Sequence, residues 1–198
     1  MKIIRLSGKE FIAKLLSGER DFDWVGLEGS FNITRHERFL ELQEYCRKQH
    51  FSKSPLQFNY AILYQVVARG LSLPHLRAYK ANFQGADFSV LTDEDVHAQM
   101  KYVSDQDPYR GSQPVLKREA SLSESFFVHA NLAYANLRGT DLSNATLVGA
   151  NLCDVHVEEA DFRNVDLNGA IITNKDIFEA RNTESVRNLE LAVSIITL

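Results

Sequence analysis

The sequence predicts a mainly β fold in which short strands and tight corners wind into a coiled ribbon around its own core. An apolar residue recurs every five positions, and a small residue precedes nearly every one by two places. These apolar central positions are Leu122, Phe127, Leu132, Leu137, Leu142, Leu147, Leu152, Val157, Phe162, Leu167, Ile172 and Ile177. A helix repeats near 3.6 residues and a strand every two, so neither period alone explains the spacing. The two inward residues of a unit are two apart, as in a strand, but the next step is three, so every unit contains a corner.

Residues at the expected corners support this interpretation. The positions just before the central ones are mostly short and polar: Asn131, Asn136, Asp141, Asn151, Asp161, Asp166 and Asp176. Asn and Asp side chains bond to nearby backbone groups and favour turns. Gly139, Gly149 and Gly169 follow central positions by two places, where a tight corner uses glycine. We therefore interpret these polar residues as corner chemistry rather than as ligands.

The segment from Ala130 to Gly139, which reads Ala-Asn-Leu-Ala-Tyr-Ala-Asn-Leu-Arg-Gly, closely resembles the signature of the pentapeptide-repeat family. The resemblance implies a right-handed quadrilateral β-helix with four pentads, hence about twenty residues, per coil. Residues 120–179 would then form the main β-helix, in three coils. A single coil cannot bury enough apolar surface to be stable, so neighbouring coils must stack.

The same five-residue period also occurs nearer the N-terminus. Residues 81–90 contain two good pentads with Phe83 and Phe88 at their centres, which places β-helix pentads at 76–90. Residues 20–34 resemble the opening of family members, with Phe22 and Leu27 as central residues, so we expect the first β-helix strands there. The resemblance also implies a helical N-terminal cap over residues 1–19.

Three further segments interrupt or end the repeat. Residues 35–75 are expected to be a helical insertion, because two stretches show apolar residues at helical spacing. The first stretch contains Phe39, Leu42 and Cys46, and the second contains Ala61, Ile62, Gln65 and Val66. Residues 91–119 are polar and aperiodic, as in a loop insertion, and residues 180–198 lose the period and could cap the last coil or join two copies into a homodimer.

Charge is distributed unevenly along the chain. The formal net charge is −4, but residues 1–79 carry twelve Lys/Arg and eight Asp/Glu, whereas residues 120–179 carry three and nine. The acidic repeat disfavours nucleic-acid binding and favours a basic partner surface. The absence of a long apolar run argues against a membrane span, and two widely spaced cysteines with no signal-peptide core favour a cytoplasmic location.

The sequence contains no recognised catalytic motif. There is no phosphate loop, dinucleotide fingerprint, HExxH or paired CxxC. Neither Cys153 with His156 nor the group His36, Cys46 and His50 supplies a full metal-ligand set. We therefore expect no enzyme activity, no cofactor, no metal and no small-molecule substrate.

These observations favour a non-enzymatic protein–protein interaction module built on the β-helix, with a protein partner of unknown identity. The candidate contact residues are Tyr102 and Tyr109 in the loop insertion and the acidic group Glu158, Glu159 and Asp161. The alternative is a DNA-mimic regulator of a type II topoisomerase such as gyrase, a role the family resemblance suggests and the acidic repeat supports. A third alternative is an enzyme or metal protein that uses the helical insertion. The resemblance also associates the chain with bacteria, cyanobacteria in particular.

Overall fold

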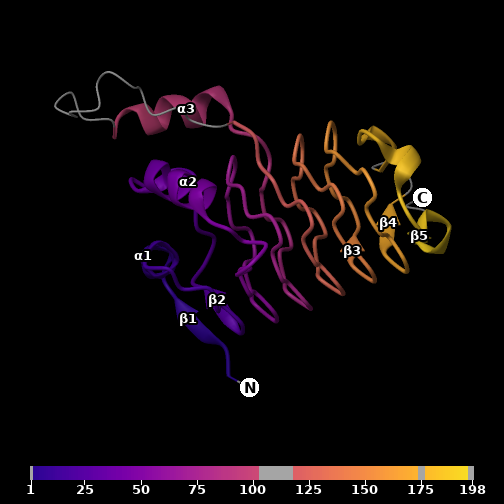
Figure 1. Cartoon of the computed structure of the whole chain (residues 1–198), viewed down its shortest axis with the longest axis horizontal. Helices are drawn as coiled ribbons and strands as arrows, with labels where there is room; N and C mark the ends of the chain where they lie inside the picture. Colours follow the sequence, from indigo (N-terminus) through magenta and orange to yellow (C-terminus); the bar gives the residue numbers. More distant parts are fainter. Residues whose placement is uncertain (1, 103–117, 174–176, 196–198) are drawn as a thin grey trace.

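The computed structural model describes residues 2–102, 118–173 and 177–195, and most of them form stacked coils (Figure 1). The chain begins with strand β1 (Ile4–Leu6), helix α1 (Gly8–Leu16) and strand β2 (Val25–Leu27). We call the N-terminal coils the lower coils and the C-terminal coils the upper coils. Two helices lie on one side of the lower coils, α2 (Phe39–Lys48) and α3 (Asp93–Met100). The upper coils contain β3 (Asn151–Leu152), β4 (Ile171–Thr173) and β5 (Val193–Ile195), with 3-10 turns η1 (Ile177–Glu179), η2 (Thr183–Ser185) and η3 (Leu189–Leu191).

Parallel backbone pairing joins each coil to the next in four rows. Row 1 contains Asp21, Gln57, Arg77, Phe126, Thr146, Asp166 and Arg187. Row 2 contains Arg5, Gly26, Ile62, Asn82, Asn131, Asn151, Ile171 and Val193. Row 3 runs from Asn32 through Val67, Asp87 and Asn136 to His156, and row 4 from Ser72 through Ser121, Asp141 and Asp161 to Arg181. Between residues 57 and 181 the step within a row is twenty residues wherever no segment is inserted, so the predicted coil of four pentads describes this part of the chain.

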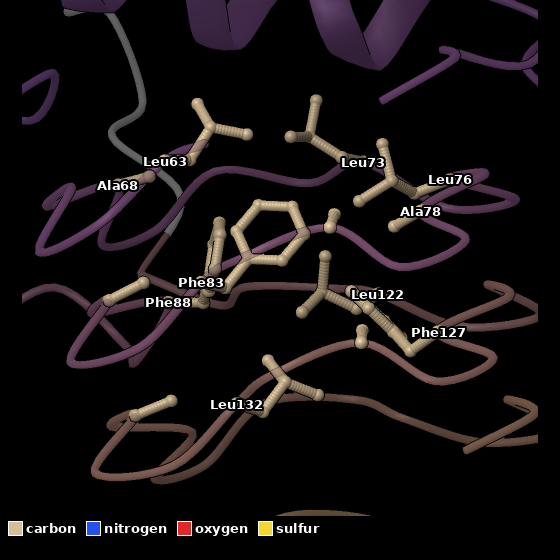
Figure 2. Close-up of a cluster of buried hydrophobic side chains, with 14 of the residues drawn as sticks. Leu63, Ala68, Leu73, Leu76, Ala78, Phe83, Phe88, Leu122, Phe127 and Leu132 are labelled. Atoms are coloured by element: carbon tan, nitrogen blue, oxygen red, sulfur yellow. The ribbon is translucent and has the colours of Figure 1, made fainter. Parts of the chain in front are cut away.

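The core is a column of buried apolar side chains. Figure 2 shows inward-pointing members of this column from Leu63 to Leu132. The twelve central residues of 122–177, together with Phe83 and Phe88, are all buried, with at most 8% of any residue exposed. Row 1 has seven levels, so its six spacings of ~4.8 Å span roughly 29 Å. This length includes the three coils predicted for residues 120–179 together with the coils on either side of them.

The corners use the predicted chemistry. Asn131, Asp141 and Asn151 each accept a hydrogen bond at their Oδ1 from the backbone N–H two residues later, at 3.1, 2.9 and 3.1 Å. Gly139 and Gly149 have φ of 66° and 64°, in the left-handed region where glycine is unstrained. The interpretation of these residues as corner chemistry is confirmed.

The prediction of two helices within residues 35–75 is wrong for the second helix. Only α2 forms, and residues 56–75 continue the coils, with Phe58, Leu63, Ala68 and Leu73 at central positions. The five-residue period is hard to detect in residues 56–75 because large and small side chains exchange places between the two inward positions of a unit. Leu71 and Leu76 occupy places that hold small residues elsewhere, while Ala68 and Ala78 occupy central ones.

Two buried hydroxyl groups each bond a backbone group that lacks the usual turn hydrogen bond of its unit. Thr140 and Ser125 occupy inward positions that hold Ala or Val in most other units, and both are fully buried. Thr140 Oγ1 donates to the carbonyl of Phe88 at 2.7 Å, just before the chain departs towards α3. Ser125 Oγ accepts from the N–H of Leu76 at 3.0 Å. An unpaired buried backbone group is costly, which explains these two hydroxyls.

Helix α1 lies against the first coil. Ser7 and Glu10 form a capping box, in which the Ser7 hydroxyl accepts from the Glu10 N–H at 3.3 Å and Glu10 accepts from the Ser7 N–H at 2.8 Å. The side chains of Phe11, Ile12 and Leu15 are buried on the coil side of the helix. Capping and burial of one apolar face together account for a helix of only nine residues.

The C-terminal segment does not lose its periodicity completely. Arg181, Arg187 and Val193 pair with Asp161, Asp166 and Ile171 in the coil beneath, in steps of six residues instead of five. Each step carries a short 3-10 turn, and Asn182 and Asn188 take left-handed φ values of 60° and 58°. Residues 177–195 therefore form a further, wider turn on top of the stack.

Candidate protein-interaction site

The predicted acidic contact group is largely paired within the chain. Glu158 accepts from Arg138 Nε at 2.7 Å, across one coil spacing, and this hydrogen bond lowers its pKa. Glu159 is exposed, and its Oε2 lies 3.7 Å from Arg181 Nε. Asp161 is only 9% exposed and accepts from Asn182 Nδ2 at 2.8 Å, so it is not available as a contact residue.

Asp161 and Asp166 attach the C-terminal turn to the coil beneath it. Asp166 Oδ1 accepts from Asn188 Nδ2 at 2.9 Å, in the same way that Asp161 binds Asn182. Burial alone would raise the pKa of both carboxyls, but the hydrogen bonds outweigh it and leave both pKa values below the ordinary one. Some of the acidic residues of the repeat therefore have a structural role.

Of the two tyrosines predicted in the loop insertion, Tyr102 is 39% exposed just beyond the end of α3, while Tyr109 lies outside the described residues. Helix α3 begins with a capping box between Thr92 and Asp95. Its contacts with the coils are strongly polar, because Gln99 Nε2 donates to the carbonyl of Thr34 at 2.5 Å. The prediction of a loop for residues 91–119 is therefore wrong for residues 93–100, where a capping box and contacts with the coils stabilise a helix, and residues 103–117 lie outside the described residues.

An ion-pair network fixes this helix to the coils. Arg69 donates to both carboxylate oxygens of Asp95, at 2.6 and 2.7 Å, and to Asp87 at 2.9 Å. The side chain of Asp95 is fully buried, which by itself would raise its pKa. The hydrogen bonds from Arg69 and Thr92 outweigh burial and hold the pKa of Asp95 at about 2. Asp95 therefore stays charged at neutral pH, and we assign the network a structural role.

Aromatic side chains form a column along one corner of the lower coils, between rows 1 and 2. Trp24 and Tyr60 stack with ring centroids 4.3 Å apart and planes at 11°. Tyr79 meets Tyr60 edge-on at 5.4 Å, and His129 lies 6.0 Å from Tyr79. We call these four residues the aromatic corner. Trp24 and Tyr60 are half-buried, whereas Tyr79 and His129 are exposed.

The backbone at this corner is an unfavourable place for large side chains. Trp24, Tyr60 and His129 have φ of 60°, 58° and 55°. Higher in the same column, Gly149 and Gly169 hold the equivalent place, with φ of 64° and 63°. The left-handed conformation costs a non-glycine residue roughly 1–2 kcal/mol. Left-handed φ also occurs at other non-glycine corners, for example at Gln65, Glu124 and Tyr134, so what distinguishes this corner is its run of contacting rings. That run makes the aromatic corner the strongest candidate site.

Two cations lie beside the aromatic corner. The Arg77 guanidinium lies 4.0 Å from the centroid of the Phe126 ring, and Lys80 Nζ lies 5.2 Å from that of Tyr79. The nearby carboxylate of Asp23 is engaged, because its Oδ1 accepts from the Asn59 N–H at 2.8 Å. The surface around the rings is thus both aromatic and basic.

Sequence reasoning missed the aromatic corner because it depends on the register of the lower coils. Tyr60 lies at the edge of the stretch that was expected to form a second helix, and no local sequence pattern singles out Trp24. With Phe22 and Phe58 recognised as stacked central residues, Trp24 and Tyr60 each follow by two places. That common offset was the available signal.

The described residues offer little for catalysis. They contain no cluster of three or more His, Cys, Asp or Glu that could hold a metal ion. Burial raises the pKa of the Cys46 thiol to about 12, which leaves it unreactive at neutral pH. The cavity between α1 and the lower coils has only apolar side chains around it, among them Phe11, Phe58 and Leu71. Within the described part of the chain, no helix is both long and apolar enough to cross a bilayer.

Comparison with known proteins identifies the repeat. A family model described as pentapeptide repeats matches residues 118–148 and 147–176, which is under a third of the chain. No curated protein matches the sequence. The predicted resemblance is confirmed, and with it the coiled β fold of this segment.

Solved structures of pentapeptide-repeat proteins resemble the chain at low identity. One from the Arabidopsis thaliana thylakoid lumen is 20% identical with a TM-score of 0.34, and the match covers 55% of this chain and 59% of that protein. Rfr23 from the cyanobacterium Cyanothece 51142 is 17% identical with a TM-score of 0.29, over 95% and 96% of the two chains. QnrB1, a plasmid-mediated fluoroquinolone resistance protein, is 13% identical with a TM-score of 0.29, over 89% and 77%. The match thus spans less than two thirds of the Arabidopsis protein's length.

Proposed function

Because residues 118–176 belong to the pentapeptide-repeat family, we propose that this chain is a non-enzymatic β-helix that binds a protein partner through its aromatic corner. The observation that carries the proposal is the run of contacting aromatic side chains, Trp24, Tyr60, Tyr79 and His129, on the outer surface of the coils. Tyr79 and His129 are exposed, so part of this aromatic surface is accessible to a partner.

The chemistry of the corner indicates the kind of partner. Trp and Tyr dominate the energetic centres of protein interfaces, because they bury a large area with few rotatable bonds. Arg77 and Lys80 flank the rings, and residues 1–79 carry four more positive than negative charges. The partner surface should therefore combine apolar groups with acidic residues. This differs from the basic partner surface expected from the acidic repeat, because the acidic group near Glu158 is paired within the chain.

The experiment compares Trp24→Asn and Tyr60→Asn, singly and together, with Tyr134→Asn as a matched control. Asn tolerates left-handed backbone, so each substitution removes a ring and keeps the corner. Tyr134 has φ of 60° and is 57% exposed at a different corner. The wild type and variants are immobilised, and proteins retained from extracts of the source organism are quantified by mass spectrometry.

The proposal expects a discrete set of proteins to be lost with the corner variants. Truncation of a central interface aromatic costs at least about 2 kcal/mol, hence roughly a thirty-fold weaker association. Tyr134→Asn should retain the same set as the wild type. Equal recovery with every variant, or equal loss with the control, would refute the assignment, provided that thermal melts show all variants folded.

A second candidate is a DNA-mimic regulator of a type II topoisomerase. It gains support from the length of row 1, whose seven levels span roughly 29 Å at ~4.8 Å per level, because a longer rod is a better mimic of a duplex. The pairing of Glu158, Glu159 and Asp161 with Arg138, Arg181 and Arg163 weakens it. A gyrase supercoiling assay distinguishes the two candidates, since the aromatic-corner proposal expects no inhibition.

We propose further that the coil is right-handed, that α1 caps its lower end and that the protein is cytoplasmic. The family resemblance supports a right-handed sense for the coil and a capping role for α1. The cysteines at 46 and 153 are both free thiols, which supports a reducing compartment such as the cytoplasm.

A further inference from the structure

Row 2 ends in a strand at both ends of the stack. At the lower end β1 pairs with β2, and at the upper end β5 pairs with β4, in both cases parallel (Figure 1). Among the described residues, no strand pairs with the outer edge of β1 or of β5. In a parallel ladder, alternate residues direct their backbone groups to opposite neighbours. Because Ile4 and Val193 donate inward, to Trp24 and Ala170 at 2.8 and 2.7 Å, the backbone groups of Arg5 and Ser194 face outward.

Both edges also expose apolar side chains. Ile4 stacks over the buried Val25 but is 58% exposed, since no coil lies beneath it among the described residues. At the other end Leu191 and Val193 are 52% and 55% exposed. Natural edge strands are commonly protected by charge, proline or a covering element, and an unprotected edge invites strand pairing. Strand β5 contains no charged residue and no proline, whereas β1 contains the exposed Arg5, which suits pairing with the more acidic upper end of another copy.

We propose that copies of this chain stack end to end, with β5 of one copy pairing parallel to β1 of the next. Such a contact continues row 2 across the junction with the same strand direction. The two ends also differ in charge. Residues 2–20 carry five basic and two acidic residues, whereas residues 177–195 carry two basic and three acidic ones.

The geometry favours this arrangement over a symmetric one. A two-fold contact between two β5 strands would make them antiparallel and bring two acidic ends together. The end-to-end contact is heterologous, so it leaves one free end of each kind and can extend into longer assemblies. The aromatic corner lies along the side of the stack, so this inference goes beyond the proposed function and does not depend on it.

The test measures molar mass by light scattering after size exclusion, over roughly 1–100 µM protein, a range that detects micromolar affinity. Ile4→Lys blocks the lower edge and Val193→Lys the upper one, while Tyr134→Lys adds the same charge at an exposed site away from both ends. The wild type and Tyr134→Lys should exceed the 22.5 kDa monomer mass as concentration rises. Each edge variant alone should remain a monomer, although thermal melts show it folded.

The decisive sample is an equimolar mixture of the two edge variants. One variant retains a free upper edge and the other a free lower edge, so the mixture should give a one-to-one dimer and nothing larger. A wild type that stays monomeric over the whole range would overturn the proposal. So would association lost in Val193→Lys but unchanged in Ile4→Lys, which identifies a symmetric contact between upper ends, or association that neither variant changes.

Discussion

Thr140→Val should destabilise the protein although the substitution replaces a buried hydroxyl by a methyl group of similar size. Thr140 Oγ1 donates to the carbonyl of Phe88 at 2.7 Å, and Thr140 is fully buried. In the preceding unit, the N–H of Ala86 donates a turn hydrogen bond to the carbonyl of the central residue Phe83. At the insertion the equivalent N–H, that of Leu91, donates to the carbonyl of Arg118, so the carbonyl of Phe88 lacks this turn bond. Val supplies no donor and leaves this acceptor buried without a partner, at a cost of about 1–3 kcal/mol.

The assay is urea unfolding followed by far-ultraviolet circular dichroism, with midpoints compared at constant slope. Thr140→Ser retains the hydroxyl and loses one methyl group, so its cost should be near 0.8 kcal/mol. Thr146→Val lies on the half-exposed outer face and should stay within about 0.5 kcal/mol of the wild type. A general preference for apolar residues at inward positions predicts the opposite result. If Thr140→Val proves as stable as the wild type, the structural reason given for this residue is wrong.

The remaining predictions concern the core, the docking of α3 and the C-terminal turn. Leu147→Asp places a carboxylate in the filled middle of the stack and should give insoluble or unfolded protein, so a soluble variant with a cooperative melt would contradict the coil register. The pKa of Asp95 is about 2 when folded and near 3.9 when unfolded, so its stabilisation is complete above about pH 5 and is lost as pH falls towards 2. Asp95→Asn should therefore lower stability at pH 7 and flatten the acid limb of the stability curve, and an unchanged limb in urea titrations would count against the network. Asp161→Ala removes the acceptor for Asn182 and should speed amide hydrogen exchange in residues 181–195. The control Asp141→Ala should leave that exchange unchanged. Equal exchange rates in the two variants would show that Asp161 does not attach the C-terminal turn.

The register of the upper coils could be predicted from sequence because nearly every unit there places a large and a small side chain at the same two inward positions. A large residue such as Leu142 fills the centre, and a small one such as Ala145 begins the next unit. The coils of residues 56–75 could not be predicted in the same way. There the central position holds the small Ala68 and the position that begins the next unit holds the large Leu71, so a search for large central residues preceded by small ones fails.

The C-terminal turn and the aromatic corner were missed for a different reason. The turn repeats Arg-Asn-x-Glu at residues 181–184 and 187–190, but its six-residue step falls outside a search for pentads. The aromatic corner brings Trp24 and Tyr60 together across an insertion, so no local pattern connects them. Composition identified the acidic residues of the repeat, but it could not show that Glu158 is paired with an arginine one coil away.

Site-specific photo-crosslinking tests the central claim, that the aromatic corner contacts a protein partner, most directly. A benzophenone amino acid replaces Tyr79 at the exposed end of the corner, or Tyr134 at the control corner, and the proteins are irradiated in extracts of the source organism. We predict a discrete crosslinked product at Tyr79, absent at Tyr134 and lost when Trp24→Asn is added. Products that are the same at both positions, or none at Tyr79 when the wild type retains a partner, would contradict the proposed function.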